Sequence, residues 1–485
     1  MDRHVWILAC GLAGCAQLAG IDNTTDERTG VSLTLERVSI GATVVRTPAD
    51  LNGLGLSATY LADEGEVPAT AGEPGVWGAD IRAQTPPVRF TVPTNDPMIR
   101  NTLLWTFPNG NLVGEFAFLE HPGAAPPSPD AQITATITLD VPYNGELVRI
   151  YTVGAWGIRD FGAADIPLAT TTYGPVTFPM SSMTNLSGRK DLDRITPNDA
   201  ILVLRYLGSD LVGAVEIPSF DQNLADTITA TLATVAHDKT LSVNIDPAGT
   251  STRFSAPRPA VTNIAMSWGI YAAPGHLLND TRGPQLMAAG ITPTDPPSVL
   301  TASYGNPFTG RDWKPMFQTV ATANRTYTPP APELPMTLNA AVVQVIPEPA
   351  SGVDAKFPGG LPELIALDGR SLSTDNVLVQ TPTAPVTLTF TTDRAAGSLY
   401  IGQLFVMVPN AANTAMVHKL VITQAAPEPR MVFAPNLLEA GKLYTFRAIA
   451  YAGGYPNVAS GDLRNMTGTG IAYGYLDSGV IRVTP

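Results

Sequence analysis

The feature that most constrains the fold of this chain is an alternation of apolar and polar residues that recurs in short segments. The pattern is clearest at 133–139, 228–232, 241–245 and 386–390, where Ile, Val, Leu, Ala or Phe alternates with Thr, Ser or Asn. Successive side chains of a β-strand point to opposite faces of the sheet, so this pattern places apolar residues on one face and polar residues on the other. The pattern therefore predicts half-buried antiparallel strands.

Turn residues separate these segments throughout the chain. The sequence contains 43 glycines and 44 prolines, many of them clustered between alternating segments, as at 121–123, 305–307, 358–360 and 452–454. Helical periodicity does not extend beyond two turns in any segment. Many short strands joined by Pro/Gly turns predict an all-β protein built from several antiparallel β-sandwich domains, with few short helices.

A chain of 485 residues is long enough for about three domains. Two segments interrupt the strand pattern: residues 187–199 are polar and charged, and residues 329–335 are rich in proline. Proline-rich segments act as semi-rigid spacers. We therefore expect β-sandwich regions at 31–186, 187–333 and 334–485.

The N-terminal segment indicates export. Residues 5–14 are mostly apolar, too few to span a bilayer as a helix but typical of a secretory signal peptide. Leu12-Ala13-Gly14-Cys15 resembles the lipobox of bacterial lipoproteins. The resemblance implies a signal peptide at 1–14, acylation of Cys15, and a lipidated flexible tether at 15–30. Simple secretion and a chance apolar start are the alternative interpretations.

This resemblance also implies where the protein resides. The acylated Cys15 would anchor the chain to a membrane of the bacterial cell envelope. Residue 16 is alanine, and an aspartate there would favour retention in the inner membrane, so the outer membrane is the expected location, at its periplasmic or surface face. Cys10 and Cys15 are the only cysteines, so the chain after residue 15 contains neither a disulfide nor a cysteine-ligated metal.

The C-terminal region carries a second resemblance. Leu438 precedes Tyr444 by six residues, and Tyr444, Phe446, Ala448 and Ala450 alternate along the following segment. This arrangement resembles the sixth strand of a fibronectin type III domain, in which the tyrosine hydroxyl bonds back to the backbone in a structural tyrosine corner. The resemblance implies an immunoglobulin-like sandwich within 334–485. It implies nothing about function, because such folds carry many roles.

The sequence contains no motif of a known catalytic centre and supports no catalytic residue or cofactor. We expect His237 in an exposed turn and His418 on the solvent face of a strand. Carboxylates can bind Ca²⁺ when they cluster. A cluster of this kind in the predicted linker is Asp191, Asp193 and Asp199, although a solvated turn explains it equally.

Two tryptophans occur in loop-like contexts. Trp77 lies between glycines, and Trp313 follows Gly310-Arg311-Asp312. Aromatic rings can stack on the apolar faces of sugars, so both are candidates for ligand binding. Packing against the edge of a sandwich is the competing interpretation.

The leading functional hypothesis is a non-catalytic, lipid-anchored envelope protein whose sandwiches serve binding, adhesive or structural roles. An envelope polysaccharide or another protein would be its partner. The net charge of −13 argues against nucleic acid, because an acidic surface repels phosphate backbones. One alternative is a carbohydrate-active protein that binds or hydrolyses polysaccharide. A second alternative is an accessory subunit of an envelope complex.

Overall fold

The structure is a computed structural model. It describes residues 28–40, 44–48, 57–60, 66–68, 70–71, 75–82, 88–91, 103–105, 111–118, 132–153, 157–179, 182–185, 199–220, 227–255, 263–274, 283–311, 313–330, 333–356, 360–392, 399–455, 457–464 and 470–485. The predicted signal peptide, Cys15 and most of the predicted tether lie outside the described residues. No helix among the described residues has the length and apolar character needed to cross a bilayer.

The prediction of an all-β fold is confirmed. The alternating segments form strands whose apolar residues are buried, as for Ile133, Ala135 and Ile137 in β10 (Gln132–Thr138). Within the described residues the α-helical structure is α2 (Pro247–Ser255). This helix begins after Asp246, whose Oδ1 accepts a hydrogen bond from the Gly249 N–H at 2.9 Å, the usual role of an N-cap residue.

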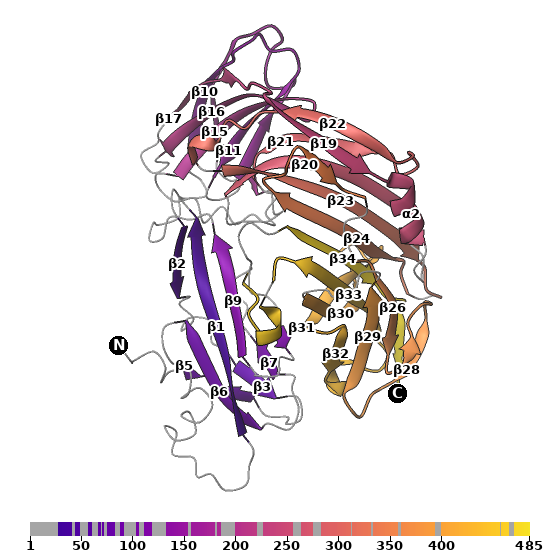
Figure 1. Ribbon diagram of the computed structural model, residues 1–485. Helices are drawn as coiled ribbons and strands as arrows, with labels where there is room; N and C mark the ends of the chain where they lie inside the picture. The colour runs from indigo at the N-terminus through magenta and orange to yellow at the C-terminus, as the bar shows by residue number, and fades with distance from the viewer. Residues whose placement is uncertain are drawn as a thin grey trace.

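The first sandwich occupies the upper part of Figure 1. Its smaller sheet has the order β13-β10-β17, and its larger sheet has the order β14-β12-β11-β15-β16-β18. The two sheets enclose a core that includes Ile150, Phe161 and Val203. The bounds of the remaining strands are β11 (Leu147–Thr152), β12 (Gly157–Phe161), β13 (Thr172–Pro179), β14 (Thr184–Asn185), β15 (Asp199–Leu207), β16 (Asp210–Phe220), β17 (Thr227–Thr231) and β18 (Ala233–Thr234).

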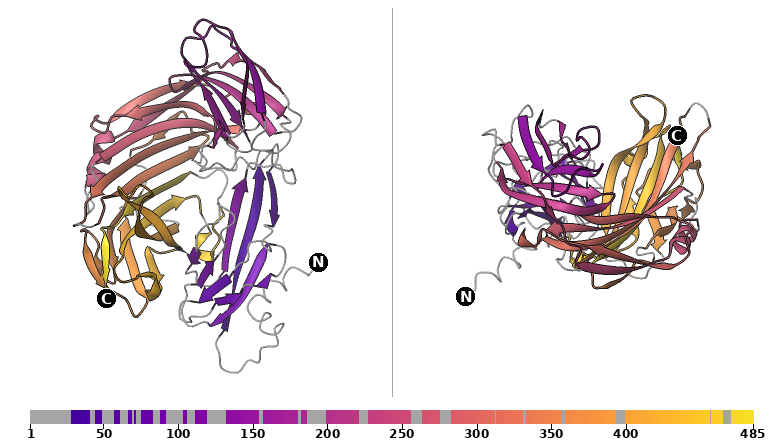
Figure 2. Two further views of the ribbon diagram at one scale, coloured as in Figure 1. Left: turned by 180° about the vertical axis from the view of Figure 1, so that it is seen from behind. Right: turned by 90° about the horizontal axis from the view of Figure 1, so that it is seen from above.

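A long sheet supplies one layer of the next two sandwiches, and Figure 2 shows it as one twisted surface. Its path is β21-β20-β23-β24-β34-β33-β30-β31-β8-β7-β3-β4, and β33 also pairs with β35, which pairs with β28. The bounds are β21 (Gln285–Ile291), β20 (Asn263–Pro274), β23 (Trp313–Tyr327), β24 (Met336–Pro347), β34 (Ile471–Asp477), β33 (Leu443–Gly453), β30 (Leu399–Pro409), β31 (Met416–Ala426), β8 (Leu103–Trp105), β7 (Val88–Thr91), β3 (Ser57–Tyr60), β4 (Glu66–Pro68), β28 (Val377–Gln380) and β35 (Ile481–Thr484).

The second sandwich forms where a small sheet of order β22-β19-β25 packs on the β21-β20-β23-β24 part of the long sheet. Trp268 and Phe317 stack in its core with ring centroids 6.2 Å apart. The strand bounds are β19 (Lys239–Ile245), β22 (Ser298–Tyr304) and β25 (Gly352–Asp354), and a 3₁₀ turn, η4 (Thr309–Arg311), precedes β23.

The third sandwich packs a sheet of order β27-β26-β29-β32 on the C-terminal part of the long sheet. Tyr444, which is 1% exposed, accepts a hydrogen bond on its hydroxyl oxygen from the Glu439 N–H at 3.0 Å. Leu438 is buried beside it, so these two residues have the geometry of a tyrosine corner. The bounds are β26 (Pro362–Leu367), β27 (Arg370–Ser371), β29 (Val386–Thr392) and β32 (Arg430–Phe433), with 3₁₀ turns η5 (Pro435–Leu437) and η6 (Val458–Ser460).

The N-terminal strands lie beside the third sandwich although they are distant in sequence (Figure 1). β8 pairs in parallel with β31, and Val113 exchanges backbone hydrogen bonds with Gly461 and Leu463 at 2.8 Å each. A separate sheet has the order β2-β1-β6-β5, with β9 paired to β1. Its bounds are β1 (Arg28–Ile40), β2 (Val44–Pro48), β5 (Thr70–Ala71), β6 (Val76–Arg82) and β9 (Asn111–Phe118).

Strand pairing crosses both of the boundaries expected from the sequence. β11 and β15 pair in one sheet although residues 187–199 separate them in the chain. β23 and β24 pair on either side of residues 329–335. Polar and proline-rich segments mark connections between strands, and these two connections join neighbouring strands of the same sheet rather than separate domains.

We predict that Tyr444→Phe destabilises the third sandwich by about 1–3 kcal/mol, because the half-buried Glu439 N–H loses its acceptor. The shift of the urea unfolding transition measures this loss. Tyr473→Phe is the matched control, because within the described residues its hydroxyl has no hydrogen-bond partner. An equal shift in both variants would contradict the role assigned to the Tyr444 hydroxyl.

Candidate functional site

A polar cleft lies at one end of the second sandwich. Its volume is about 500 Å³, within the range of small-molecule sites. It opens where the first residues of β19 and β23 meet the last residue of β22 and the turn that follows β24. We call it the Trp313 cleft, and its lining residues are Lys239, Thr240, Tyr304, Asn306, Thr309, Trp313, Lys314, Pro315, Glu348, Pro349 and Ser351.

Local hydrogen bonds fix the loop that closes one side of the Trp313 cleft. The Asn306 side chain donates from Nδ2 to the Trp313 carbonyl at 2.9 Å and accepts from the Phe308 N–H at 3.1 Å. A Cβ at position 305 would overlap the Ala236 carbonyl oxygen, so the chain requires Gly305 here. The wall of the cleft is therefore a defined turn that links β22 to β23.

Trp313 forms part of the floor of the cleft. Its side chain is 2% exposed and packs on Phe308, with ring centroids 5.9 Å apart. The Arg311 guanidinium lies over the ring at 5.7 Å and pairs through Nε with Glu216 of the first sandwich at 2.5 Å. Trp313 thus packs at a sandwich edge, as one sequence interpretation expected, and lines a cleft at the same position.

Polar side chains around the floor supply hydrogen-bonding groups. Thr240, Thr309 and Ser351 are exposed, and each presents a hydroxyl that can donate and accept. Burial raises the pKa of the Tyr304 hydroxyl, and the charge of Asp238 adds to the effect, so this hydroxyl stays protonated at neutral pH. Glu348 has a φ of 42°, which is uncommon for a residue with a side chain and places it in the left-handed region.

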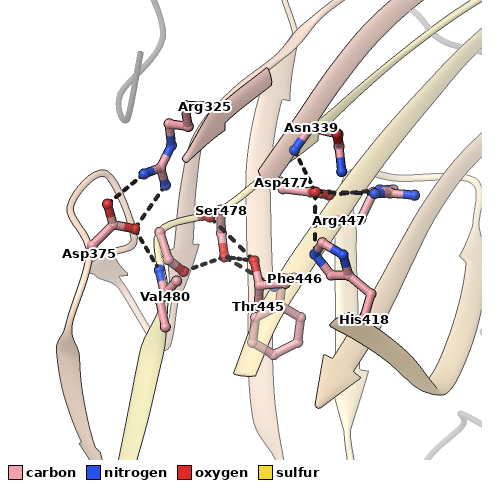
Figure 3. A network of polar contacts seen from close by, with 11 residues as sticks. Arg325, Asn339, Asp375, His418, Thr445, Phe446, Arg447, Asp477, Ser478 and Val480 are labelled. Atoms are coloured by element: carbon pink, nitrogen blue, oxygen red, sulfur yellow. Dashed lines mark hydrogen bonds and ion pairs between the residues drawn. The ribbon is translucent and has the colours of Figure 1, made fainter. Parts of the chain in front are cut away.

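A second polar cluster lies within the long sheet, where Asp477 joins three neighbouring strands (Figure 3). Its carboxylate accepts from Arg447 Nε at 2.7 Å and Nη2 at 3.1 Å, and from the Asn339 N–H at 2.8 Å. The Arg447 guanidinium also lies over the rings of Phe405 and Tyr475, at 5.1 and 4.5 Å. A buried carboxylate with this many partners has its desolvation offset, which is the arrangement of a structural ion pair.

His418 extends from β31 towards this cluster, and its Nε2 lies 3.6 Å from Asp477 Oδ2. We expected His418 on the solvent face of a strand. It does lie on a strand, but its side chain is 18% exposed and packs edge-on against Phe405. Burial lowers the pKa of His418 below its ordinary value, and Arg447 adds to this effect, while Asp477 opposes it.

Neighbouring contacts fix the C-terminal end of the same sheet. Arg325 makes a bidentate ion pair with Asp375 at 2.5 and 2.8 Å, and Asp375 also accepts from the Val480 N–H at 3.0 Å (Figure 3). Ser478 Oγ accepts from the Phe446 N–H at 3.0 Å. These contacts involve no cleft, so they account for stability rather than for ligand binding.

The predicted site residues are not brought together by the fold. Asp191 and Asp193 lie outside the described residues, whereas Asp199 begins β15 opposite Phe220. Trp77 lies in β6, paired with Leu33, and so belongs to a strand rather than a loop. The described residues contain no group of three or more His, Cys, Asp or Glu side chains that could hold a metal ion.

Sequence reasoning missed most of the residues in both clusters. Lys239, Tyr304, Lys314 and Glu348 are separated by up to 109 positions and share no motif. The one available signal was that Lys239 and Tyr304 end alternating segments, where loops gather at the edge of a sandwich. Asp477 lies in an otherwise apolar segment, and a charged residue there was a signal that a buried partner existed.

Comparisons with known proteins assign no family to this chain. No family model matches it, and no curated protein matches it. Among solved structures, the crystal structure of Salmonella alpha-2-macroglobulin reacted with methylamine aligns at 9% identity with a TM-score of 0.11. That alignment covers 88% of this chain and 29% of the other, and a TM-score this low supports no conclusion about fold or function.

We predict that neutral His418 contributes stability that is lost in acid. In the unfolded chain His418 titrates near its ordinary pKa of 6.5, and the folded pKa is lower. Its contribution is therefore fully present above pH 6.5 and declines as pH falls towards the folded pKa. Unfolding in urea from about pH 8 to about pH 5 should give a weaker pH dependence for His418→Gln than for the wild type.

The control for this experiment is Lys419→Gln, an exposed neighbour on the same strand that does not titrate in this range. This variant should retain the wild-type pH dependence. An unchanged pH dependence in His418→Gln would show that the burial of His418 carries no linked stability.

Proposed function

We propose that this chain is a non-catalytic, lipid-anchored protein of the bacterial cell envelope that binds a saccharide in the Trp313 cleft. The observation that carries the proposal is the cleft itself: a polar depression of about 500 Å³ with an aromatic floor. A volume of this size accommodates one or two sugar rings. The cleft lies at the end of a sandwich, where loops carry binding residues on a rigid scaffold.

The chemistry of the lining favours a saccharide over a purely apolar ligand. Sugars present many hydroxyls together with apolar ring faces, so their sites combine hydroxyl and amide groups with aromatic surface. The cleft offers the hydroxyls of Thr240, Thr309, Ser351 and Tyr304 around Trp313. The apolar faces of Pro315 and Pro349 add surface on which a ring can lie.

The carboxylates of the cleft support binding without hydrolysis. Glycoside hydrolysis ordinarily uses two carboxylates on either side of the scissile bond, about 5 to 10 Å apart. Among the described residues that line the cleft, Glu348 is the one carboxylate. A single acid can accept hydrogen bonds from sugar hydroxyls but does not make the paired centre that hydrolysis needs.

The anchoring part of the proposal rests on the sequence. The apolar segment 5–14 followed by Leu12-Ala13-Gly14-Cys15 resembles a lipoprotein signal, and the polar residues after Cys15 would tether the sandwiches. A multiply acylated cysteine would hold the chain at a membrane, because each buried CH₂ contributes about 0.8 kcal/mol. The proposed location is the outer membrane, at its periplasmic or surface face.

We predict that Ser351→Trp abolishes saccharide binding by filling the cleft. Ser351 is exposed on the cleft wall, and the Ser242 N–H donates to its backbone carbonyl, so the substitution leaves that hydrogen bond in place. We expect affinity to fall by about tenfold or more, equivalent to about 1.4 kcal/mol, when the full chain is assayed against a panel of purified polysaccharides.

Ser298→Trp is the matched control, because Ser298 is exposed at the opposite end of β22 from Tyr304. It should retain wild-type binding. Equal binding by wild type and Ser351→Trp would refute the cleft as the site. Release of new reducing ends from any bound polysaccharide would refute the non-catalytic part of the proposal.

The anchor has its own prediction, which is that acylation depends on Cys15. The full chain and a Cys15→Ala variant would be expressed in a Gram-negative host supplied with an alkyne fatty acid. Label on the wild type alone is the expected result. Equal label on both, or soluble export of both without label, would refute anchoring through Cys15.

A further inference from the structure

The two walls of the Trp313 cleft carry one lysine each. Lys239 is the first residue of β19 in the small sheet, and Lys314 is the second residue of β23 in the long sheet. The cleft lies between the ends of these two sheets. The whole chain contains six lysines and has a net charge of −13, so two lysines in one cleft is a local concentration of positive charge.

Lys239 is available to a ligand. Its side chain is exposed, and it has no ion-pair partner within the described residues. The nearby cation Arg311, in contrast, is held by Glu216 at 2.5 Å and lies over the Trp313 ring. The cation at the rim of the cleft is therefore separate from the cation that builds its floor.

Acidic groups lie near the cleft without neutralising Lys239 directly. Glu348 lines the wall, and Asp238 influences Tyr304. No ion pair joins either carboxylate to Lys239 or Lys314 among the described residues. Because opposite charges here remain unpaired, a ligand anion can bind between the lysines while its hydroxyls donate to Glu348.

From this geometry we infer that the Trp313 cleft binds a saccharide that carries an anionic group, a carboxylate or a phosphate, between Lys239 and Lys314. The inference rests on the proposed saccharide-binding function and specifies its ligand class. The sugar ring lies over the floor around Trp313, and the hydroxyls of Thr240, Thr309 and Ser351 bind its neutral positions. A local positive site of this kind selects anions even on an acidic protein, because the nearest charges dominate the field.

The test measures affinity of the full chain for three purified polymers: polygalacturonate, its methyl ester and a phosphomannan. The methyl ester keeps the sugar backbone and removes the charge, and the phosphomannan distinguishes phosphate from carboxylate. We expect at least one anionic polymer to bind more tightly than the methyl ester. Binding should weaken in about 1 M NaCl, where the Debye length falls to about 3 Å.

Substitutions assign the charge effect to the two lysines. Lys239→Gln should weaken binding of the anionic polymer by about fivefold, as expected for one partly exposed ion pair. The double variant Lys239→Gln/Lys314→Gln should weaken it further, and Glu348→Gln should strengthen it by removing a repulsive charge. Lys419→Gln, exposed on β31 and outside the cleft, is the matched control and should bind like the wild type.

The outcomes separate this inference from the proposed function. Equal affinity for polygalacturonate and its methyl ester, or wild-type affinity in the double lysine variant, would overturn the anionic ligand and leave saccharide binding intact. Absence of binding to every polymer tested, charged or neutral, would overturn both. Preference for an anionic polymer that the lysine substitutions remove would support the inference.

Discussion

The antiparallel pairing of β23 with β24 is the constraint on which the other parts of the structure depend. It runs from Met316–Pro347 to Tyr327–Met336, and it joins the second sandwich to the third in one sheet. On the same face of β23, Phe317 belongs to the second core, and Ala321 and Ala323 belong to the third. A register shift by one residue would turn all of these side chains out of both cores.

This shared strand also determines where the Trp313 cleft lies. β23 begins at Trp313, so the residues that start the shared ladder are also the floor and one wall of the cleft. The ion pair of Arg311 with Glu216 ties the same region to the first sandwich. The cleft therefore lies at a junction of two sandwiches on backbone fixed by packing, which favours a preformed site over one assembled on binding.

Particular elements show how far the sequence could lead. Alternation at 133–139 and 386–390 predicted strands, because burial of one sheet face imposes a period of two on local sequence. The charged segment 187–199 and the proline-rich segment 329–335 predicted domain boundaries, yet each connects neighbouring strands of one sheet. A connection between domains and a connection between paired strands have the same composition, so local sequence does not distinguish them.

By itself the sequence determined the all-β class, the turns between strands, and the spacing of Leu438 and Tyr444. All three depend on interactions between residues close in the chain or on which side of one strand faces the core. The tertiary structure alone decided that Lys239, Trp313 and Glu348 line one cleft, and that Asp477 meets Arg447 and Asn339. Those contacts join distant segments through strand pairing, and no local pattern encodes which strands pair.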